Sequence, residues 1–155
     1  MKNICFYQTE IGKIGIADDN EFITDVVLAG EEEPFNAMIK ETPLNKEAAT
    51  QIKEYLKGSR KDFDLPLKPE GTDFQLRVWQ ALLAIPYGET RSYQEIAEQA
   101  GNIKACRAVG LANNRNPIAI IIPCHRVIGK NGSLTGYGGG LEIKARLLEL
   151  EKNNR

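Results

Sequence analysis

The sequence predicts an α+β fold in two parts: a small N-terminal domain built on an antiparallel sheet, and a helical C-terminal domain containing a winged helix-turn-helix. Short β-branched and aromatic segments separated by turn residues fill residues 1–66, which predicts strands. Helical periodicity behind N-terminal capping residues dominates the later part. Residues 67–73 between them resist regular structure and predict a linker, which leaves 74–155 as the second domain.

The N-terminal domain is expected to serve as a scaffold. Its strands are expected at residues 4–7, 14–16 and 22–28, with turns at 11–13 and 18–20. Apolar residues at helical spacing predict a helix over 45–56, which Gly58 can end. Residues 63–65 are expected to add a last short strand, and nothing in 1–66 forms a reactive constellation.

Two capping boxes open the helices of the C-terminal domain. Thr72 stands three residues before a Gln and predicts a helix over 72–85 that the next proline ends. Ser92 stands three residues before a Glu and predicts a short helix over 93–100. After a turn at Gly101, a further helix is expected over 104–113, which completes a helix-turn-helix.

The end of the chain combines glycine-rich loops with a final helix. Residues 129–134 predict a turn or wing, and the glycines of 136–140 can pass close to a flat ligand. The final helix is expected over 141–152, with Glu151 outside its apolar stripe. That stripe is expected at Leu141, Ala145 and Leu148.

Charge is distributed unevenly along a chain whose formal net charge is only −1. Residues 99–141 contain no Asp or Glu, but they contain Lys104, Arg107, Arg115, Arg126 and Lys130. A segment of one sign predicts a docking face for a polyanion such as nucleic acid, with salt-sensitive binding. The alternative is that acidic residues from elsewhere fold back and neutralise it.

Cysteine usage and hydropathy exclude several classes of protein. The three cysteines make no disulfide framework, and no signal-peptide or membrane-spanning segment is present, which predicts a cytoplasmic location without membrane contact. No Cys-x-x-Cys pair occurs and the chain has one histidine, so no metal site is expected.

The apolar run 118–122 is the element on which the functional prediction depends. It predicts a buried strand between Pro117 and Pro123 that delivers Cys124 and His125 to a fixed place. A thiol beside an imidazole is typical of an activated sulfur nucleophile, because the thiolate is the reactive species. Neighbours on a strand face opposite ways, so either the backbone turns at the second proline or a water carries the proton; we favour the water. The alternative is a buried cysteine and a hydrogen-bonded histidine without chemistry.

Eight short motifs then resemble one family, the O6-alkylguanine-DNA alkyltransferases, also called methylated-DNA–protein-cysteine methyltransferases. In the C-terminal half they are Arg107–Gly110, Asn116–Pro117, Pro123–Val127, and Gly136–Tyr137 ahead of Gly139–Leu141. Nearer the linker they are Phe74–Gln75, Val78–Trp79, Pro86–Gly88 and Ser92–Tyr93. The resemblance covers residues 72–152 closely and implies a ribonuclease H-like fold for the N-terminal domain.

The resemblance implies single-turnover DNA repair by direct reversal. The protein would bind double-stranded DNA as a monomer without an obligate protein partner, flip out an O6-alkylguanine, and move the alkyl group irreversibly to Cys124 without a cofactor. Activity on O4-alkylthymine stays open. His125 would take the thiol proton through a water, Glu151 would orient the imidazole, and Tyr93 would donate to N3 of the leaving guanine.

The resemblance also implies DNA contacts and a pocket for the base. Arg107 would fill the gap left in the stack, and the carbonyls of Cys124 and Val127 would accept from the exocyclic amine. The remaining DNA contacts are expected at Lys104, Ser92, Arg115 and Arg126. The pocket is expected to be lined by Tyr137, Gly138, Val127 and Asn113, with Asn116 bracing the active-site turn.

Two other functions are compatible with parts of this pattern. A non-catalytic alkyltransferase-like protein would bind lesions, but such proteins have Trp where this chain has Cys124. A Cys-His hydrolase would turn over and would leave the helix-turn-helix unexplained. The chain also departs from some relatives, because Gly138 offers no side chain to O6 and Cys5 alone cannot form an N-terminal zinc site.

Overall fold

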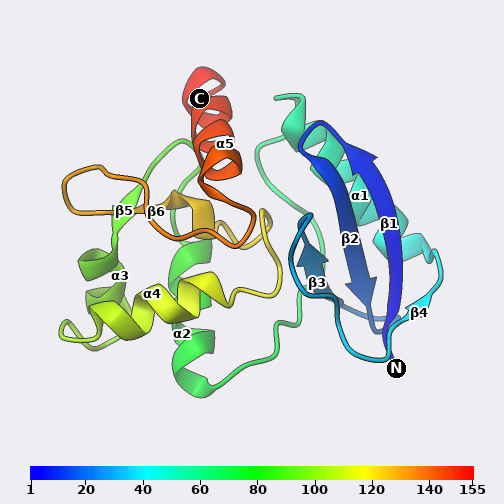
Figure 1. Ribbon diagram of the computed structural model, residues 1–155, viewed down its shortest axis with the longest axis horizontal. Helices are drawn as coiled ribbons and strands as arrows, with labels where there is room; N and C mark the ends of the chain where they lie inside the picture. The colour runs from blue at the N-terminus through cyan, green and yellow to red at the C-terminus, as the bar shows by residue number, and fades with distance from the viewer. The chain divides into compact units, whose positions relative to one another are not determined.

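The computed structural model describes residues 1–155 and has the expected α+β fold, with a sheet in its N-terminal part and helices in its C-terminal part (Figure 1). It divides into two compact units. The first contains Met1–Glu70 and also Pro117–Ile121, and the second contains Gly71–Asn116 and Ile122–Arg155. The sequence did not anticipate that a segment from the C-terminal half groups with the first unit. The domain limits at 66 and 74 stay a prediction about independently folding parts.

A four-stranded sheet forms the centre of the first unit, in the order β3-β2-β1-β4. Its strands are β1 (Asn3–Thr9), β2 (Gly12–Asp18), β3 (Ile23–Val27) and β4 (Met38–Ile39). β1, β2 and β3 are antiparallel neighbours as expected, but β4 was missed and pairs with β1 in parallel. The strand expected at 63–65 is wrong, because the chain there makes only an isolated bridge from Leu67 to Ile23.

Helix α1 (Pro43–Leu56) packs against β1, β2 and β3. Thr42 and Asn45 form a reciprocal capping box at its N-terminus, and a proline occupies the first turn, where no hydrogen-bond donor is lost. Gly58, with a φ of 82°, lies just past the helix end, as the sequence predicted. The fully buried Ile16, Ile23 and Ile52 belong to the core between helix and sheet.

One carboxylate, that of Asp18, is fully buried in the first unit. It accepts hydrogen bonds from the Asn3 amide, the Thr42 hydroxyl and the backbone N–H of Asn20. Each of these three donors is neutral, and Asp18 takes part in none of the ion pairs of the structure. These bonds join β1, β2 and the start of α1 without bringing a reactive group near.

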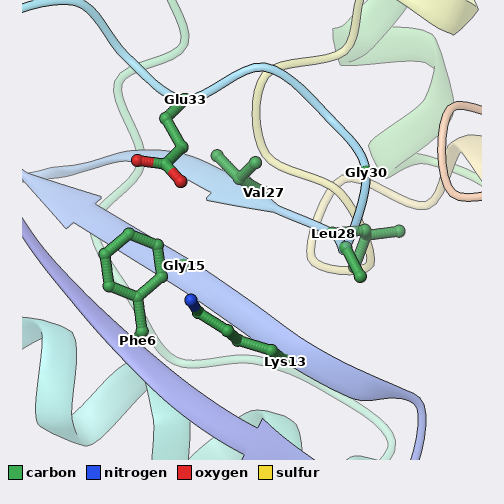
Figure 2. Close-up of a pocket in the computed structure, with 8 residues that line it drawn as sticks. Phe6, Lys13, Gly15, Val27, Leu28, Gly30 and Glu33 are labelled. Atoms are coloured by element: carbon green, nitrogen blue, oxygen red, sulfur yellow. The ribbon is translucent and has the colours of Figure 1, made fainter.

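A pocket of about 190 Å³ opens on the sheet of the first unit (Figure 2). The Phe6 ring lines this pocket, and the Lys13 ammonium lies 4.6 Å from the ring centroid. Gly15 keeps this space free of a side chain, since a Cβ there would approach the Phe6 ring to 3.0 Å. Glu33 completes the polar lining. None of the residues that line this pocket is a cysteine or a histidine.

The second unit is mainly helical (Figure 1). Its helices are α2 (Asp73–Leu83), α3 (Tyr93–Gln99), α4 (Cys106–Asn114), α5 (Leu141–Asn153) and the short 3-10 helix η1 (Cys124–Arg126), and its strands are β5 (Arg91–Ser92) and β6 (Val127–Ile128). Both expected capping boxes are present, at Thr72 and Ser92. The Trp79 indole donates to the Ala112 carbonyl at 2.8 Å and so ties α2 to α4. β5 and β6 pair in parallel.

The apolar stripe expected on α5 is wrong. Leu141 is 48% exposed and Ala145 is exposed, whereas the buried residues of this helix are Lys144, Leu147 and Glu151. Positions three and four apart share one helical face, so this face buries two charged side chains around one leucine. Helix α5 therefore contributes polar groups to the interior.

The strand expected at 118–122 is also wrong, although these residues are all buried. Only Ile118 makes a bridge, in parallel with Val26 of β3, and the chain then turns. Ile120 has a φ of 72°, a left-handed conformation that costs a β-branched residue about 1–3 kcal/mol. The run is a buried turn in the first unit, after which the chain returns to the second unit at Ile122.

Candidate active site

Cys124 starts the 3-10 helix η1, directly after Pro123. The backbone does turn at this proline, whereas transfer of the thiol proton through a water stays a prediction. The missing N–H of proline costs nothing here, because it precedes the first turn of the helix. Cys124 is only 5% exposed, and its backbone N–H donates to Ile122 at 2.8 Å. The turn holds the sulfur in one place.

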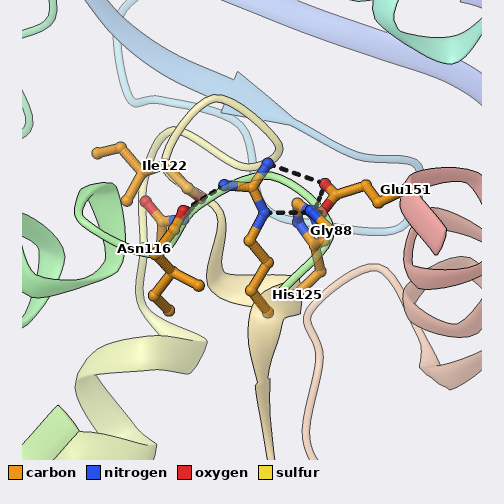
Figure 3. Close-up of polar contacts among 7 residues, drawn as sticks. Gly88, Asn116, Ile122, His125 and Glu151 are labelled. Carbon is orange, nitrogen blue, oxygen red and sulfur yellow. Dashed lines mark hydrogen bonds and ion pairs between the residues drawn. The ribbon is translucent and has the colours of Figure 1, made fainter. Parts of the chain in front are cut away.

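Two asparagines hold the backbone on either side of the sulfur. Asn116 donates from its side chain to the Ile122 carbonyl at 2.8 Å (Figure 3). Asn113, on α4, donates to the Cys124 carbonyl at 3.2 Å. That carbonyl also accepts from the N–H of Val127, so both of its lone pairs are in use and a guanine amine would have to displace one donor.

Glu151 is the centre of a buried polar cluster, which we call the Glu151 cluster: His125, Arg126, Glu151 and the N–H of Gly88. Its Oε2 lies 2.6 Å from Nε2 of His125, and its Oε1 accepts from Gly88 N at 3.1 Å (Figure 3). Arg126 donates from Nε and from a terminal nitrogen to the two oxygens, at 2.8 and 3.0 Å. A forked arginine–carboxylate pair of this kind is strong and fixes the carboxylate geometry.

His125 is fully buried, and this burial lowers the pKa of its imidazole below the usual value. The hydrogen bond and the charge of Glu151 act in the opposite direction, while the positive charges of Arg126 and Lys144 add to the lowering. A neutral imidazole can accept a proton, so the cluster keeps His125 in the form that a base requires. Glu151 fixes the ring orientation through Nε2.

Tyr93, Thr135 and Lys144 are linked at the loop before α5. The Tyr93 hydroxyl lies 2.9 Å from the Thr135 hydroxyl and 3.2 Å from the Thr135 carbonyl. Lys144 donates to the same carbonyl at 2.8 Å. Neither Thr135 nor Lys144 was identified from the sequence. Tyr137 and Gly138 follow in the same loop, the first half-buried and the second exposed.

The residues expected to contact DNA divide into an exposed and a buried set. Lys104, Arg107 and Arg115 are exposed on or beside α4, and Ser92 is half-buried and caps α3. Arg126 is only 7% exposed; besides Glu151 it binds the Ile85 carbonyl at 2.7 Å. Its donors are turned inward, so the expected DNA contact for Arg126 has to be replaced by a role within the Glu151 cluster.

The structure holds no group of three or more Cys, His, Asp or Glu side chains suited to a metal ion. None of its helices has the length and apolar character needed to cross a bilayer.

Comparison with protein families decides the identity of this arrangement. The family model for the 6-O-methylguanine DNA methyltransferase DNA binding domain matches residues 73–153, and that for the ribonuclease-like domain of the same enzyme matches residues 5–69. The chain belongs to the 6-O-methylguanine DNA methyltransferase family. The resemblance seen in the sequence is therefore confirmed over both halves of the chain.

Individual relatives in this 6-O-methylguanine DNA methyltransferase family are similar over almost the whole chain. A methylated-DNA–protein-cysteine methyltransferase of Methanosarcina acetivorans is 53% identical and covers 94% of this chain and 95% of its own length. A constitutive enzyme of the same name from Bacillus subtilis is 51% identical, covering 94% and 92%. A crystal structure of Mycobacterium tuberculosis OGT in complex with DNA superposes with a TM-score of 0.93 at 47% identity, covering 98% and 94%.

Proposed function

We propose that this protein repairs alkylated DNA by moving an alkyl group from O6 of guanine to its own Cys124. The buried Cys124 beside the Glu151 cluster is the observation that supports this proposal best. A stable thioether forms at the sulfur, so each molecule acts once and no cofactor takes part. The lesion-binding alternative lacks a nucleophile and does not account for Cys124.

Deprotonation of the thiol is the first step of the proposed reaction. An ordinary thiol has a pKa of about 8.5, so at neutral pH it needs a base or a positive field. His125, kept neutral by burial, takes the proton through a water. Glu151 then stabilises the imidazolium that forms, and Arg126 keeps the carboxylate in place.

Transfer follows when the thiolate attacks the alkyl carbon. The S–C bond forms as the C–O6 bond breaks, and the electron pair of that bond moves onto the guanine. Tyr93 leaves its bond to Thr135 and donates to N3, which neutralises the charge of the leaving base. The thiol proton passes to His125 and on to solvent. The guanine receives its proton from Tyr93, and solvent restores the Tyr93 proton.

Access to the base requires that it leaves the DNA stack. Lys104 and Arg115 hold phosphates of double-stranded DNA, while Arg107 on the exposed side of α4 fills the gap left by the flipped guanine. The loop with Tyr137 and Gly138 closes one wall of the pocket, and Val127 and Asn113 line another. The protein acts as a monomer in the cytoplasm without an obligate protein partner.

The test is transfer of label from O6-methylguanine in a duplex oligonucleotide to the protein. Label should reach a ceiling of one equivalent on Cys124, and Cys124→Ala should abolish transfer. Cys106→Ala is the matched control and should transfer as the wild type does, because Cys106 lies on α4 and outside the Glu151 cluster. Turnover beyond one equivalent would favour a hydrolase and overturn the proposal.

A further inference from the structure

A strained turn centred on Ile120 lies shortly before Cys124 in the chain, and the proposed chemistry does not use it. The N–H of Ile121 donates to the carbonyl of Ala119 at 2.8 Å, and Ile120 between them has a φ of 72°. A hydrogen bond of this span around a positive φ marks the classic γ-turn, which is rare and strained. The β-branched side chain of Ile120 makes this conformation more costly still. Such a turn persists only where its surroundings hold it.

Strand β3 holds the chain immediately before this turn. Val26 donates from its backbone N–H to the Pro117 carbonyl at 2.9 Å, and its own carbonyl accepts from the Ala119 N–H at 3.4 Å. These two bonds form the parallel bridge between Val26 and Ile118. β3 is an edge strand of its sheet, so these two groups of Val26 have no partner in the four strands. Val26 therefore fixes the point at which the turn begins.

The chain immediately after the turn leads to the sulfur. The Ile122 carbonyl accepts from the Asn116 side chain and from the Cys124 N–H, both at 2.8 Å. The second of these bonds closes another γ-turn, around Pro123, whose φ of −82° and ψ of 65° match the common inverse form. The first turn ends at Ile121 and the second begins at the next residue, so no slack chain separates them.

Burial prevents this segment from absorbing a displacement. Ile118, Ile120 and Ile122 are each 1% exposed or less. Packed interiors have low compressibility, so a shift in one side chain is passed on to its neighbours. A change in how β3 holds Ile118 should therefore move the backbone at Cys124, although the two residues belong to different units.

We propose that Val26 is a positioning residue for the nucleophile: its backbone hydrogen bonds hold the strained turn at Ile120 and so set the place of the Cys124 sulfur. The first unit, which the sequence predicts to be a scaffold, then contributes to the rate of alkyl transfer. This contribution rests on the proposed function, whereas the effect of Val26 on the position of the sulfur does not. The segment Pro117–Ile121 is the covalent path by which it acts.

Loss of this hold should act on the maximal rate of transfer. Without the bond from Val26, the Ile120 backbone can relax toward an extended conformation, which a β-branched residue prefers. The sulfur then spends less time in line with the alkyl carbon, and a displacement of about 1 Å can cost about 100-fold in rate. Pocket residues on other elements keep their places, so the affinity for the base should not change.

An amide-to-ester replacement removes this hold and leaves every side chain in place. The α-hydroxy analogue of valine at position 26, which we call the Val26 ester, lacks the N–H that binds Pro117. The Ile23 ester is the matched control, because the Ile23 N–H binds the Pro66 carbonyl at 2.8 Å from the same strand. Both side chains are buried, and each protein loses one hydrogen bond. Their melting temperatures should therefore fall by similar amounts.

Single-turnover transfer from free O6-benzylguanine distinguishes the two ester proteins. The Val26 ester should transfer about tenfold more slowly at saturating base, with an unchanged half-saturating concentration and the pH profile of the wild type. The Ile23 ester should transfer as the wild type does. Equal rates in the two ester proteins would overturn the proposal, because a loss of stability alone affects both alike.

Hydrogen exchange tests the positioning without any alkylguanine. The Cys124 amide, which donates to Ile122, should exchange about tenfold faster in the Val26 ester than in the Ile23 ester, since its turn opens more easily. The same exchange rate in both would overturn the proposal. If neither these proteins nor the wild type accepts an alkyl group but the exchange rates differ, the proposed function fails and the positioning stands.

A conventional pair of variants serves if the ester proteins do not fold. Ile118→Val and Ile52→Val each remove one methylene from a fully buried side chain of the first unit. Both should lose similar stability, but only Ile118 bridges to Val26, so only Ile118→Val should slow transfer, by about threefold. Equal transfer rates in this pair would contradict the positioning role of β3.

Discussion

The two units each bury a carboxylate, and they surround it in opposite ways. Asp18 in the first unit accepts from an amide, a hydroxyl and a backbone N–H, all neutral. Glu151 in the second unit is shared between an imidazole and a guanidinium. Neutral donors can stabilise an anion, but their own charge does not change. An imidazole can gain a proton and become a cation beside the carboxylate.

In this protein one buried carboxylate holds the scaffold together, and the other lies in a cluster of ionisable groups beside a thiol. The Asp18 network joins strands and a helix start, and its donors are an amide, a hydroxyl and a backbone N–H. The Glu151 cluster holds the single histidine of the chain next to the thiol. Perturbed ionisable groups that gather around a nucleophile are typical of functional sites.

Matched substitutions of the two carboxylates test the comparison most directly. Glu151→Gln should slow single-turnover transfer about 100-fold, because His125 loses the charge that stabilises its imidazolium. Asp18→Asn should lower the free energy of unfolding by about 1–3 kcal/mol and leave transfer by the folded protein unchanged. Rapid-quench assays and denaturant titrations measure both. An unchanged transfer rate in Glu151→Gln would remove Glu151 from the proton relay.

Paired arginines extend the comparison to DNA. Arg107→Ala should weaken repair of duplex DNA about tenfold while sparing reaction with free O6-benzylguanine, since base extrusion costs a few kcal/mol only in the duplex. Arg60→Ala, which removes an ion pair with Glu54 in the first unit, should change neither reaction. Equal losses on both substrates would contradict the proposal that Arg107 fills the gap left by the flipped guanine.

Salt dependence should distinguish lysines of the two units. DNA affinity should fall as salt rises, and Lys104→Ala should reduce the slope of log affinity against log salt by about one, the value of one phosphate contact. Lys57→Ala, at the end of α1, should leave the slope unchanged. Fluorescence anisotropy at several salt concentrations measures this, and a flat response in the wild type would rule out phosphate docking.

In mild acid, the only histidine contribution to the change in the free energy of unfolding should come from His125 in the second unit. Because burial holds the pKa of His125 below its unfolded value of about 6.5, the unfolded chain takes up the proton first as pH falls. The free energy of unfolding should therefore decline from about pH 7 downward until His125 is protonated in the folded state as well. His125→Gln should flatten this decline in denaturant titrations between pH 7.5 and 5.5; parallel curves would show that His125 is not buried neutral.

Local signals in the sequence predicted the parts of the fold that local interactions determine. The capping boxes at Thr72 and Ser92 supply hydrogen bonds to free backbone N–H groups within four residues. Their pattern can therefore be recognised without the rest of the chain. Strand β4 was missed because it has two exposed residues and its parallel partner is distant in sequence. The left-handed conformation of Ile120 could not be predicted either, since the composition of this segment favours a strand and the surrounding packing imposes a turn.

The site was predictable to the extent that its motifs are specific. Cys124, His125 and Glu151 were named from the sequence, and they do lie together in the second unit, although their roles stay proposals. Lys144 was missed because a lysine on an amphipathic helix is usually solvated. Lys144 becomes recognisable only in the structure, where the buried face of α5 carries charged side chains.

The detour of Pro117–Ile121 through the first unit has a consequence for how this protein can be cut. A fragment beginning at Gly71 would lose the edge of β3 that receives Ile118, and several isoleucines would be left in water immediately upstream of the nucleophile. The backbone of the second unit is thus interrupted by a segment that belongs to the first unit. Engineers seeking a minimal alkyl acceptor would have to redesign those five residues or keep both halves.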